Sequence, residues 1–366
     1  MFSLRCFVTF FHLTETENKL LIKNFSLSKF IMLTTLVFSG LSLACGGQDV
    51  EIIEKEVVKE VPVEKVVVVQ EVKEISVIKE VPVEVIKIVV PTPEPVSVTD
   101  ALGQQLTFDS VPQRIVTLSP TASELLYFVG GRAVGRDRAS NFPLIMKSLP
   151  DVGSAYNPSM EALMAMRPDL VIIEALTQAR FAPMLAKTGI TVMAVKTESL
   201  EDITANLTMI GSVIGNENLA QQAVDDITGR LELVGQVEKS VLLLISDQER
   251  NLYAARPESY TGLIVDVLGM ENKAAGLADS GVYPGFSLMT AEAILRANPD
   301  VIVTITPAPK PAPRLSETMG QIPPFAALKA MQTGMIIEGD VDLFLQAPGP
   351  RLVEAVEFLK ARMAQQ

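Results

Sequence analysis

The side chains that carry most enzyme chemistry are nearly absent from this chain. The only His is His12, the two Cys are Cys6 and Cys45, and there is no Trp among the 366 residues. Everything after Cys45 therefore lacks a His base, a Cys nucleophile and an imidazole ligand for a metal. No GxGxxG loop follows a predicted strand. We predict that the chain is not an enzyme, with no catalytic residue and no metal site.

Two carboxylates do recur at matching positions. Glu161 and Glu292 each stand seven residues before a Pro-Asp pair, in the stretches NPSMEALMAMRPDLVII and GFSLMTAEAILRANPDVIVTI. A Glu in the first turn of a helix offsets the helix dipole by about 0.3–1 kcal/mol, which would explain either residue alone. The equal spacing of the two Glu residues is explained less easily in this way.

The same pattern surrounds both Glu residues. Apolar residues at helical spacing precede the Pro, which ends a helix, and a run of branched apolar residues after it is typical of a strand buried on both faces. The stretches 157–173 and 285–305 thus predict two helix–turn–strand units. We interpret them as parts of two similar α/β lobes with parallel sheets.

The rest of the chain fits this plan. The helix after the first strand is expected to begin with a capping box of Thr121 and Glu124 and to stop at Gly130. LYAARPESYTGLIVDVLG predicts an equivalent strand–turn–helix in the second lobe, and the Pro-free stretch from Leu200 to about Glu238 predicts a rigid helical connector. We also predict strands over 114–118, 190–195, 241–246 and 335–340, a hairpin over 97–108 and a closing helix over 350–364.

The N-terminal residues predict export. Lys residues precede an apolar run over 30–44, which is shorter than the roughly 20 residues that a membrane span needs. The run ends in Leu-Ser-Leu-Ala-Cys, which resembles a bacterial lipobox with Cys45 as the lipidated residue. An ordinary signal peptide with an incidental Cys is the alternative.

A stalk is predicted after the signal peptide. Val, Glu and Lys dominate residues 48–98, KEVPVE occurs at 59–64 and 79–84, and Pro62 and Pro82 interrupt any strand. We interpret this stretch as an extended, charged stalk, with a coiled coil or a small β element as the alternative. The predicted organisation is a signal peptide (1–44), the stalk (45–97), a first lobe (98–215), a connecting helix (216–239) and a second lobe (240–366).

From Val98 onward the chain resembles the substrate-binding proteins of ABC importers, in the group that binds cobalamin, iron–siderophores and haem. The motifs are RIVTLSPTASELLYFVGG, LPDVGSAYNPSMEALMAMRPDLVII, KTGITVMAV, GFSLMTAEAILRANPDVIV and APGPRLVEAV, and their order matches. The resemblance implies two Rossmann-like lobes joined by a single long helix, with the ligand between them. It also implies that Glu161 and Glu292 are exposed and meet Arg side chains of the membrane permease, one Glu in each lobe.

The resemblance further implies ligand contacts from both lobes. The expected residues are Ser119, Pro120, Thr121, Arg138, Tyr156, Arg256, Ser259, Tyr260, Tyr283, Phe286 and Phe344. Core packing is the alternative for each aromatic residue, and solvated surface Arg for Arg136, Arg138 and Arg256. Arg351 is expected to hold the turn of its own lobe. Cobalamin binders often carry Trp where this chain has Tyr156, Tyr283 and Phe344, so the identity of the chelate stays open.

We therefore predict a monomeric lipoprotein, in the periplasm or on the outer face of the cytoplasmic membrane. It would deliver cobalamin or an iron–siderophore to an ABC permease dimer and its ATPase, without an intrinsic cofactor. Haem, with Tyr as the axial ligand, and a surface lipoprotein without transport are alternatives. The balance of 31 basic and 43 acidic residues argues against a nucleic-acid partner, and the lack of His argues against a free-metal binder.

Overall fold

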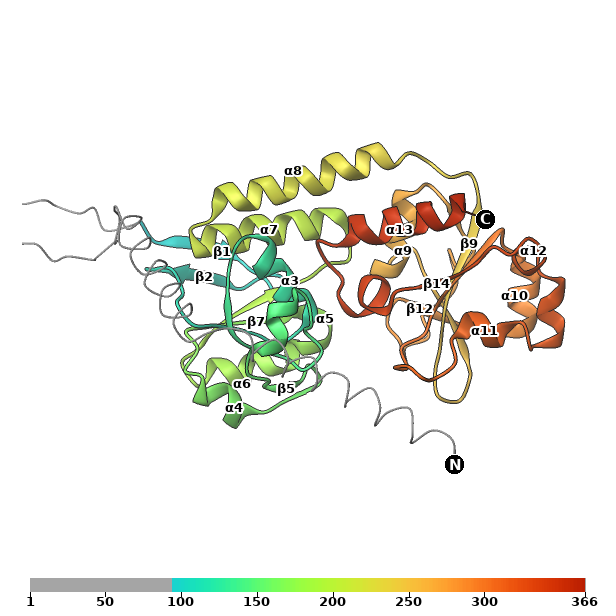
Figure 1. Cartoon of the computed structure of the whole chain (residues 1–366). Coiled ribbons are helices and arrows are strands. Elements are labelled where there is room, and N and C mark those ends of the chain that lie inside the picture. The colour runs from blue at the N-terminus through green and yellow to red at the C-terminus, as the bar shows by residue number, and fades with distance from the viewer. Residues whose placement is uncertain (1–93, 366) are drawn as a thin grey trace, which may run out of the picture. The chain divides into compact units, whose positions relative to one another are not determined.

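The computed structural model describes residues 94–365. The predicted signal peptide, Cys45 and nearly all of the predicted stalk lie outside these residues. The described chain has an α/β fold with two main sheets, and the elements around each sheet form one lobe (Figure 1). We call the elements around the four-stranded sheet the first lobe and those around the six-stranded sheet the second lobe.

The sheet of the first lobe is parallel throughout, in the order β4-β3-β7-β8. The central strands β3 and β7 are buried at every position, as expected when helices cover both faces of a sheet. The strands are β3 (Ile115–Thr117), β4 (Ala133–Arg136), β7 (Leu170–Glu174) and β8 (Thr191–Val195), with a small pair of β5 (Gly153–Ser154) and β6 (Asn157–Pro158). The helices are α3 (Pro120–Phe128), η1 (Leu144–Ser148), α4 (Met160–Ala165), α5 (Ala175–Gln178), η2 (Ala179–Phe181), α6 (Ala182–Ala186) and α7 (Leu200–Ile214).

The predicted N-terminal hairpin is confirmed. Strands β1 (Val96–Thr99) and β2 (Gln105–Phe108) pair antiparallel, and β1 begins within the range predicted for the stalk. The Asp100 carboxylate accepts hydrogen bonds from the N–H groups of Leu102 and Gln104 in the turn, and from Ala194 N–H of β8 at 3.0 Å. One side chain thus shapes the turn and fastens the hairpin to the first lobe.

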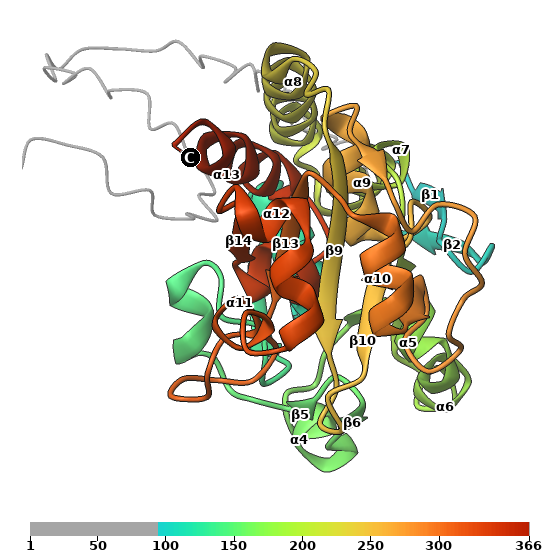
Figure 2. The ribbon, with the colours of Figure 1, turned by 90° about the vertical axis from the view of Figure 1, so that its right-hand side faces the viewer.

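The sheet of the second lobe is mixed, which corrects the prediction of two parallel sheets. Its order is β12-β10-β9-β13-β14. Strands β13 and β14 run parallel to β9 (Figure 2), whereas β10 runs antiparallel to both β9 and β12. A tight turn joins β9 to β10, with Asn251 N–H donating to the Asp247 carboxylate at 2.8 Å. So short a connection can only return antiparallel, because a parallel neighbour needs a crossover of a dozen or more residues.

The elements of the second lobe otherwise follow the predicted order. The strands are β9 (Ser240–Ser246), β10 (Leu252–Ala255), β11 (Glu271–Asn272), β12 (Phe286–Met289), β13 (Val301–Ile305) and β14 (Ile336–Gly339). The helices are α9 (Tyr260–Val267), α10 (Ala291–Ala297), α11 (Leu315–Met319), η3 (Pro323–Ala327), α12 (Lys329–Gln332), η4 (Asp342–Gln346) and α13 (Leu352–Ala364).

Two helices occupy the stretch from Leu200 to Glu238, and the second lies within the range 216–239 predicted for the connecting helix. Helix α7 ends at Gly215, whose φ of 71° is left-handed, and α8 (Glu217–Val234) begins after it. Helix α8 packs against α7 of the first lobe and against α13 of the second (Figure 1). It is therefore the single long helix that joins the lobes, and at 1.5 Å per residue its 18 residues span about 27 Å.

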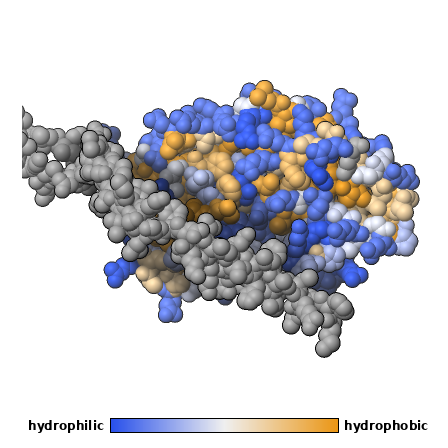
Figure 3. Space-filling view, in the orientation of Figure 1, coloured by the Kyte–Doolittle hydropathy of each residue, from blue (hydrophilic) through white to orange (hydrophobic). Residues whose placement is uncertain are grey.

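The hydrophobic core continues from one lobe into the other. One large cluster includes Leu125 of α3, Ile203 of α7, Ile227 of α8 and Val356 of α13, together with one face of each sheet. The opposite faces of the two sheets have separate, smaller clusters. Hydrophilic residues with scattered apolar ones among them cover the face shown in Figure 3. The shared core indicates that α7, α8 and α13 hold the lobes together.

Candidate ligand-binding and docking sites

Glu161 and Glu292 occupy matching places in the two lobes. Each is the second residue of a short helix, α4 or α10, whose N-cap hydroxyl accepts a main-chain hydrogen bond at 3.2 Å: Ser159 from Ala162 and Thr290 from Ala293. Both Glu side chains are exposed. Within residues 94–365 neither carboxylate takes part in a hydrogen bond or an ion pair. The arrangement offers two exposed carboxylates, one on each lobe, that can accept hydrogen bonds from a partner.

The Pro-Asp pairs after these helices have a structural role. Asp169 accepts hydrogen bonds from the N–H groups of Gln113 and Arg114 at 2.7 and 2.9 Å, at the entrance to β3. Asp300 accepts from Ser240 N–H and hydroxyl at 2.8 and 2.7 Å, at the start of β9. The ion pair with Lys329, followed by the Ser240 hydrogen bonds, holds the pKa of Asp300 well below its usual range. The predicted helix–turn–strand units are confirmed.

Buried hydroxyls begin α3 of the first lobe, which follows β3, and α9 of the second lobe, which follows β10. Ser119 is the N-cap of α3 and accepts from Ala122 N–H at 3.1 Å, so the predicted capping box of Thr121 and Glu124 is wrong. Pro120 takes the first helical position, which needs no N–H donor, so the cap is Ser119, two residues before Thr121. Ser259 caps α9 in the same way, accepting from Gly262 N–H at 3.0 Å.

The structure separates the predicted ligand aromatics into two groups. Tyr260, Phe286 and Phe344 are buried, and Phe344 packs edge-on against Phe358 with ring centroids 5.8 Å apart. Tyr156 is 67% exposed, in the turn between β5 and β6. Tyr283 is half-buried and packs edge-on against Tyr253, with centroids 4.8 Å apart. Tyr156 and Tyr283 therefore retain surface that a ligand can contact, whereas the buried three contribute to the core.

The predicted ligand arginines already have protein partners. Arg138 is largely exposed and pairs with Asp151 at 3.0 Å. Arg256 pairs with Glu258 and Asp279, both at 3.2 Å, which leaves little positive charge for an anionic ligand. Arg136 donates to the carbonyls of residues 137, 138 and 146 and so holds the loop before and within η1.

The role predicted for Arg351 is wrong. Arg351 does not hold the turn of its own lobe but crosses to α3 of the first lobe, where Nε and Nη2 donate to the two carboxylate oxygens of Glu124. Burial raises the pKa of Glu124 to about 7, although the hydrogen bond and the charge of Arg351 act in the opposite direction. The sequence offered one signal, because Glu124 is the only charged residue of α3, but this signal does not identify its partner.

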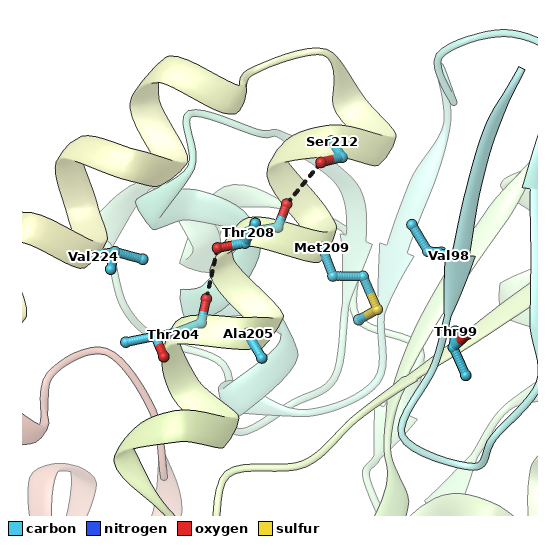
Figure 4. A pocket seen from close by; sticks show the side chains of 8 residues that line it. All are labelled: Val98, Thr99, Thr204, Ala205, Thr208, Met209, Ser212 and Val224. Carbon is cyan, nitrogen blue, oxygen red and sulfur yellow. Dashed lines mark hydrogen bonds between the residues drawn. The ribbon is translucent and has the colours of Figure 1, made fainter. Parts of the chain in front are cut away.

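A shallow pocket of about 540 Å³ lies away from all of these residues, against α7 (Figure 4). Val98 and Thr99 of β1 and Val224 of α8 complete its lining. The Thr208 and Ser212 hydroxyls each donate to a carbonyl one turn earlier in α7, so they are not directed at a ligand. None of the predicted ligand residues lines this pocket.

Neither a metal-binding cluster of side chains nor a membrane-spanning helix occurs in the described residues. In that range, no three His, Cys, Asp or Glu side chains are grouped so that they could hold a metal ion. None of the helices there has both the length and the apolar character needed to cross a membrane.

The profile of a family described as "periplasmic binding protein" matches residues 115–343. The chain is similar to an uncharacterized ABC transporter substrate-binding lipoprotein, YvrC, of Bacillus subtilis, with 28% identity over 279 residues, 72% of this chain and 84% of that protein. It is similar to a cobalamin-binding protein of Halobacterium salinarum, with 27% identity over 74% of this chain and 73% of that protein. The structure of the siderophore-binding protein BauB, bound to ferric iron and two molecules of acinetobactin, has the same fold. Its TM-score is 0.63 at 19% identity, and the match covers 73% of this chain and 98% of BauB.

Proposed function

Because the chain belongs to the periplasmic binding protein family, as the sequence predicted, we propose that it captures a metal chelate and delivers it to an ABC importer. Its relatives are named as binding proteins rather than as enzymes. Cobalamin and a ferric siderophore are the proposed ligands, as cargo rather than as an intrinsic cofactor. One relative is named cobalamin-binding, and a protein of the same fold holds a ferric siderophore.

The twin carboxylates carry the delivery part of the proposal. Glu161 and Glu292 are exposed at the same helical position in different lobes, so a permease dimer can present one Arg to each. Arg–carboxylate pairs steer an encounter and fix its orientation. Stabilisation of the helix dipole explains one Glu but not the repetition across two lobes.

The capture part rests on the residues that keep accessible surface. Tyr156 and Tyr283 offer aromatic faces, Pro120 stands half-buried at the start of α3, and Arg138 is exposed. A site with a few aromatic and polar groups of this kind suits a chelate whose metal is already coordinated. The other predicted ligand residues are buried and offer no such surface: Ser119, Thr121, Ser259, Tyr260, Phe286 and Phe344.

Anchoring completes the proposal. Lipidation of Cys45 would hold the protein outside the cytoplasm, and the stalk would space the two lobes from the membrane. The relative from Bacillus subtilis is named a lipoprotein, which supports this assignment. The lobe boundaries proposed from the sequence, 98–215 and 240–366, with the connecting helix at 216–239, complete the organisation.

Uptake by cells tests delivery. We expect Glu161→Gln combined with Glu292→Gln to lower the uptake of labelled cyanocobalamin or ferric siderophore at least about tenfold, as loss of charge-assisted pairs implies. The ligand Kd of the purified variant should stay unchanged. Glu201→Gln is the matched control, because Glu201 is also an exposed second residue of a capped helix, α7, but has no counterpart in the other lobe. Undiminished uptake by the double variant would refute docking through these residues.

Haem is the second candidate, because Tyr156 has an exposed phenol that can bind a haem iron. The visible spectrum separates the candidates. A haem complex should show an intense Soret band that Tyr156→Phe changes, whereas a cobalamin or ferric-siderophore complex keeps its spectrum in that variant. If no chelate of the three classes raises the melting temperature, the capture proposal is wrong.

A further inference from the structure

Contacts other than α8 also join the two lobes. Residues 342–351 of the second lobe, which we call the seam, lead into α13 and meet side chains of the first lobe. Asn141 Nδ2 donates to the Asp342 carboxylate at 3.0 Å, and the Thr197 hydroxyl donates to the Pro348 carbonyl at 3.2 Å. The seam ends at Arg351, which binds Glu124 of α3. The lobes are therefore fastened along a second line besides the connecting helix.

The Glu124–Arg351 pair is the most directional of these contacts. Arg351 Nε lies 2.9 Å from Glu124 Oε2, and Nη2 donates to Oε1, so two parallel hydrogen bonds link a planar guanidinium to a planar carboxylate. Such a bidentate pair fixes orientation as well as distance. The Arg351 guanidinium also lies 4.2 Å from the ring centroid of Phe142, a further residue of the first lobe.

Burial reduces the net contribution of such a pair to the free energy of unfolding. Glu124 is 2% and Arg351 7% exposed. Removing two charges from water costs about as much as their attraction returns, so a buried pair is weak evidence for stability. In contrast, only one placement of the two lobes lets Glu124 and Arg351 form both hydrogen bonds. Any other placement leaves a buried charge without its partner. The pair therefore acts on the geometry between the lobes more than on the free energy of unfolding.

We propose that Glu124 and Arg351 are a positioning pair that sets the angle between the two lobes and so pre-forms the ligand site without touching the ligand. Both lobes contribute one partner, and neither Glu124 nor Arg351 has exposed surface to offer a ligand. A pre-formed site avoids the cost of ordering the lobes when the ligand binds. The effect on affinity rests on the proposed function, whereas the effect on lobe geometry does not.

The chain supplies two controls for this proposal. Arg230 of α8 and Glu357 of α13 form another bidentate Arg–Glu pair, at 3.1 and 2.7 Å, but their side chains are 37% and 46% exposed. Solvent screens such a pair, so its loss should not alter the lobe angle. Tyr260 has a buried hydroxyl close enough to Glu124 and Arg351 for both charges to act on its pKa. Tyr260→Phe therefore removes a buried polar atom beside the pair and leaves the pair intact.

Spin-label distances test the lobe geometry without a ligand. The full chain, with Cys6 and Cys45 replaced by Ser, would carry labels at Lys187→Cys in the first lobe and Arg296→Cys in the second, both exposed positions. We expect one narrow distance distribution for this reference protein, for Glu357→Gln and for Tyr260→Phe. Glu124→Gln, which keeps the shape of the side chain, should broaden or shift the distribution. Arg351→Lys keeps the charge but loses the bidentate geometry, and should broaden it to a lesser degree.

A binding measurement then links geometry to function. With cyanocobalamin as the probe, Glu124→Gln should weaken the Kd about tenfold, mainly through faster dissociation, because the lobes must be ordered at each binding event. An unchanged distance distribution in both Glu124→Gln and Arg351→Lys would overturn the proposal, and if Glu124→Gln does not fold, Arg351→Lys decides. If the distributions change but the reference protein binds no cyanocobalamin, the positioning pair stands and the assignment of cobalamin fails.

Discussion

Asp169 and Asp300 hold equivalent positions in different lobes. Each carboxylate accepts main-chain N–H hydrogen bonds from the start of the neighbouring parallel strand, Asp169 at the entrance to β3 and Asp300 at Ser240 of β9. The two sites differ in one respect, because Asp300 also pairs with Lys329. The Pro-Asp repeat therefore fastens a strand to its neighbour in both lobes, and an ion pair strengthens this contact in the second lobe only.

Replacing Asp300 should reveal that difference. Asp300→Asn should lower the free energy of unfolding at pH 7 by about 1–3 kcal/mol, since Lys329 and the Ser240 hydrogen bonds lose a charged acceptor. The pKa of Asp300 is held below its ordinary value of 3.8, so its contribution is complete above that pH and is lost as the pH falls below it.

Urea melts at pH 7 and pH 3, each at low and high salt, measure this effect. Asp169→Asn is the control: it loses two main-chain hydrogen bonds, and no Lys pairs with Asp169 among residues 94–365. Salt should reduce the penalty of Asp300→Asn more than that of Asp169→Asn. Equal salt dependence in the two variants would show that the Lys329 pair contributes nothing.

Tyr156 and Phe344 should respond to truncation in opposite ways. Phe344 is fully buried, so Phe344→Ala should cost about 3–5 kcal/mol of stability through the cavity that it leaves. Tyr156 is mostly exposed, so Tyr156→Ala should change stability by no more than about 0.5 kcal/mol while weakening chelate binding about tenfold. Urea melts and ligand titrations give both quantities. A stable Tyr156→Ala variant with the original affinity would remove Tyr156 from the ligand site.

Glu124 should make stability depend on pH in the opposite sense to Asp300. Burial raises its pKa from 4.5 to about 7, so the folded state binds the proton more tightly than the unfolded chain does. Its contribution to stability is therefore complete below pH 4.5 and is lost as the pH rises through about 7. The free energy of unfolding of the wild type minus that of Glu124→Gln should fall across this window, as followed by urea melts in steps of pH. A flat difference would show that Glu124 stays charged throughout.

Replacing Gly215 should destabilise the protein through backbone strain and not through a steric clash. Its φ of 71° is left-handed, and an added Cβ would meet only Val111 at an ordinary 3.6 Å. Gly215→Ala should therefore cost about 1–2 kcal/mol, and Gly215→Asn less, because Asn visits this region more readily. Gly229→Ala is the control, since it lies inside α8 with open space at its Cβ, and it should stabilise the chain by about 0.4–1 kcal/mol. Thermal melts of the three variants check the order.

Features set by nearby residues could be predicted from the sequence. The helix–turn–strand units around Glu161 and Glu292 follow from apolar spacing and a Pro, and the structure has both. The N-terminal hairpin also depends on adjacent residues. Errors arose where one local signal outweighed another. Thr121 with Glu124 matched a capping pattern, although Ser119 followed by Pro120 made the better cap.

The candidate site could be predicted only in part, because burial depends on distant contacts. Nothing near Phe344 in the sequence shows that it packs into the core, or that Tyr156 stays exposed. Glu124 and Arg351 lie 227 positions apart, and no local pattern connects them. The antiparallel direction of β10 likewise depends on how tightly the chain turns after β9, which the apolar pattern of the strand does not encode.

The position of α13 in the sequence affects when the two lobes can dock during synthesis. It is the last helix of the sequence, yet it contacts α3 through Arg351 at its N-cap and α8 through Glu357 near its middle. As the chain is made from its N-terminus, the first lobe appears long before the residue that neutralises Glu124. Until α13 has been made, a growing chain must leave that carboxylate in water or bury it protonated. Native docking of the lobes therefore cannot precede the synthesis of α13, because Arg351 stands at its N-cap.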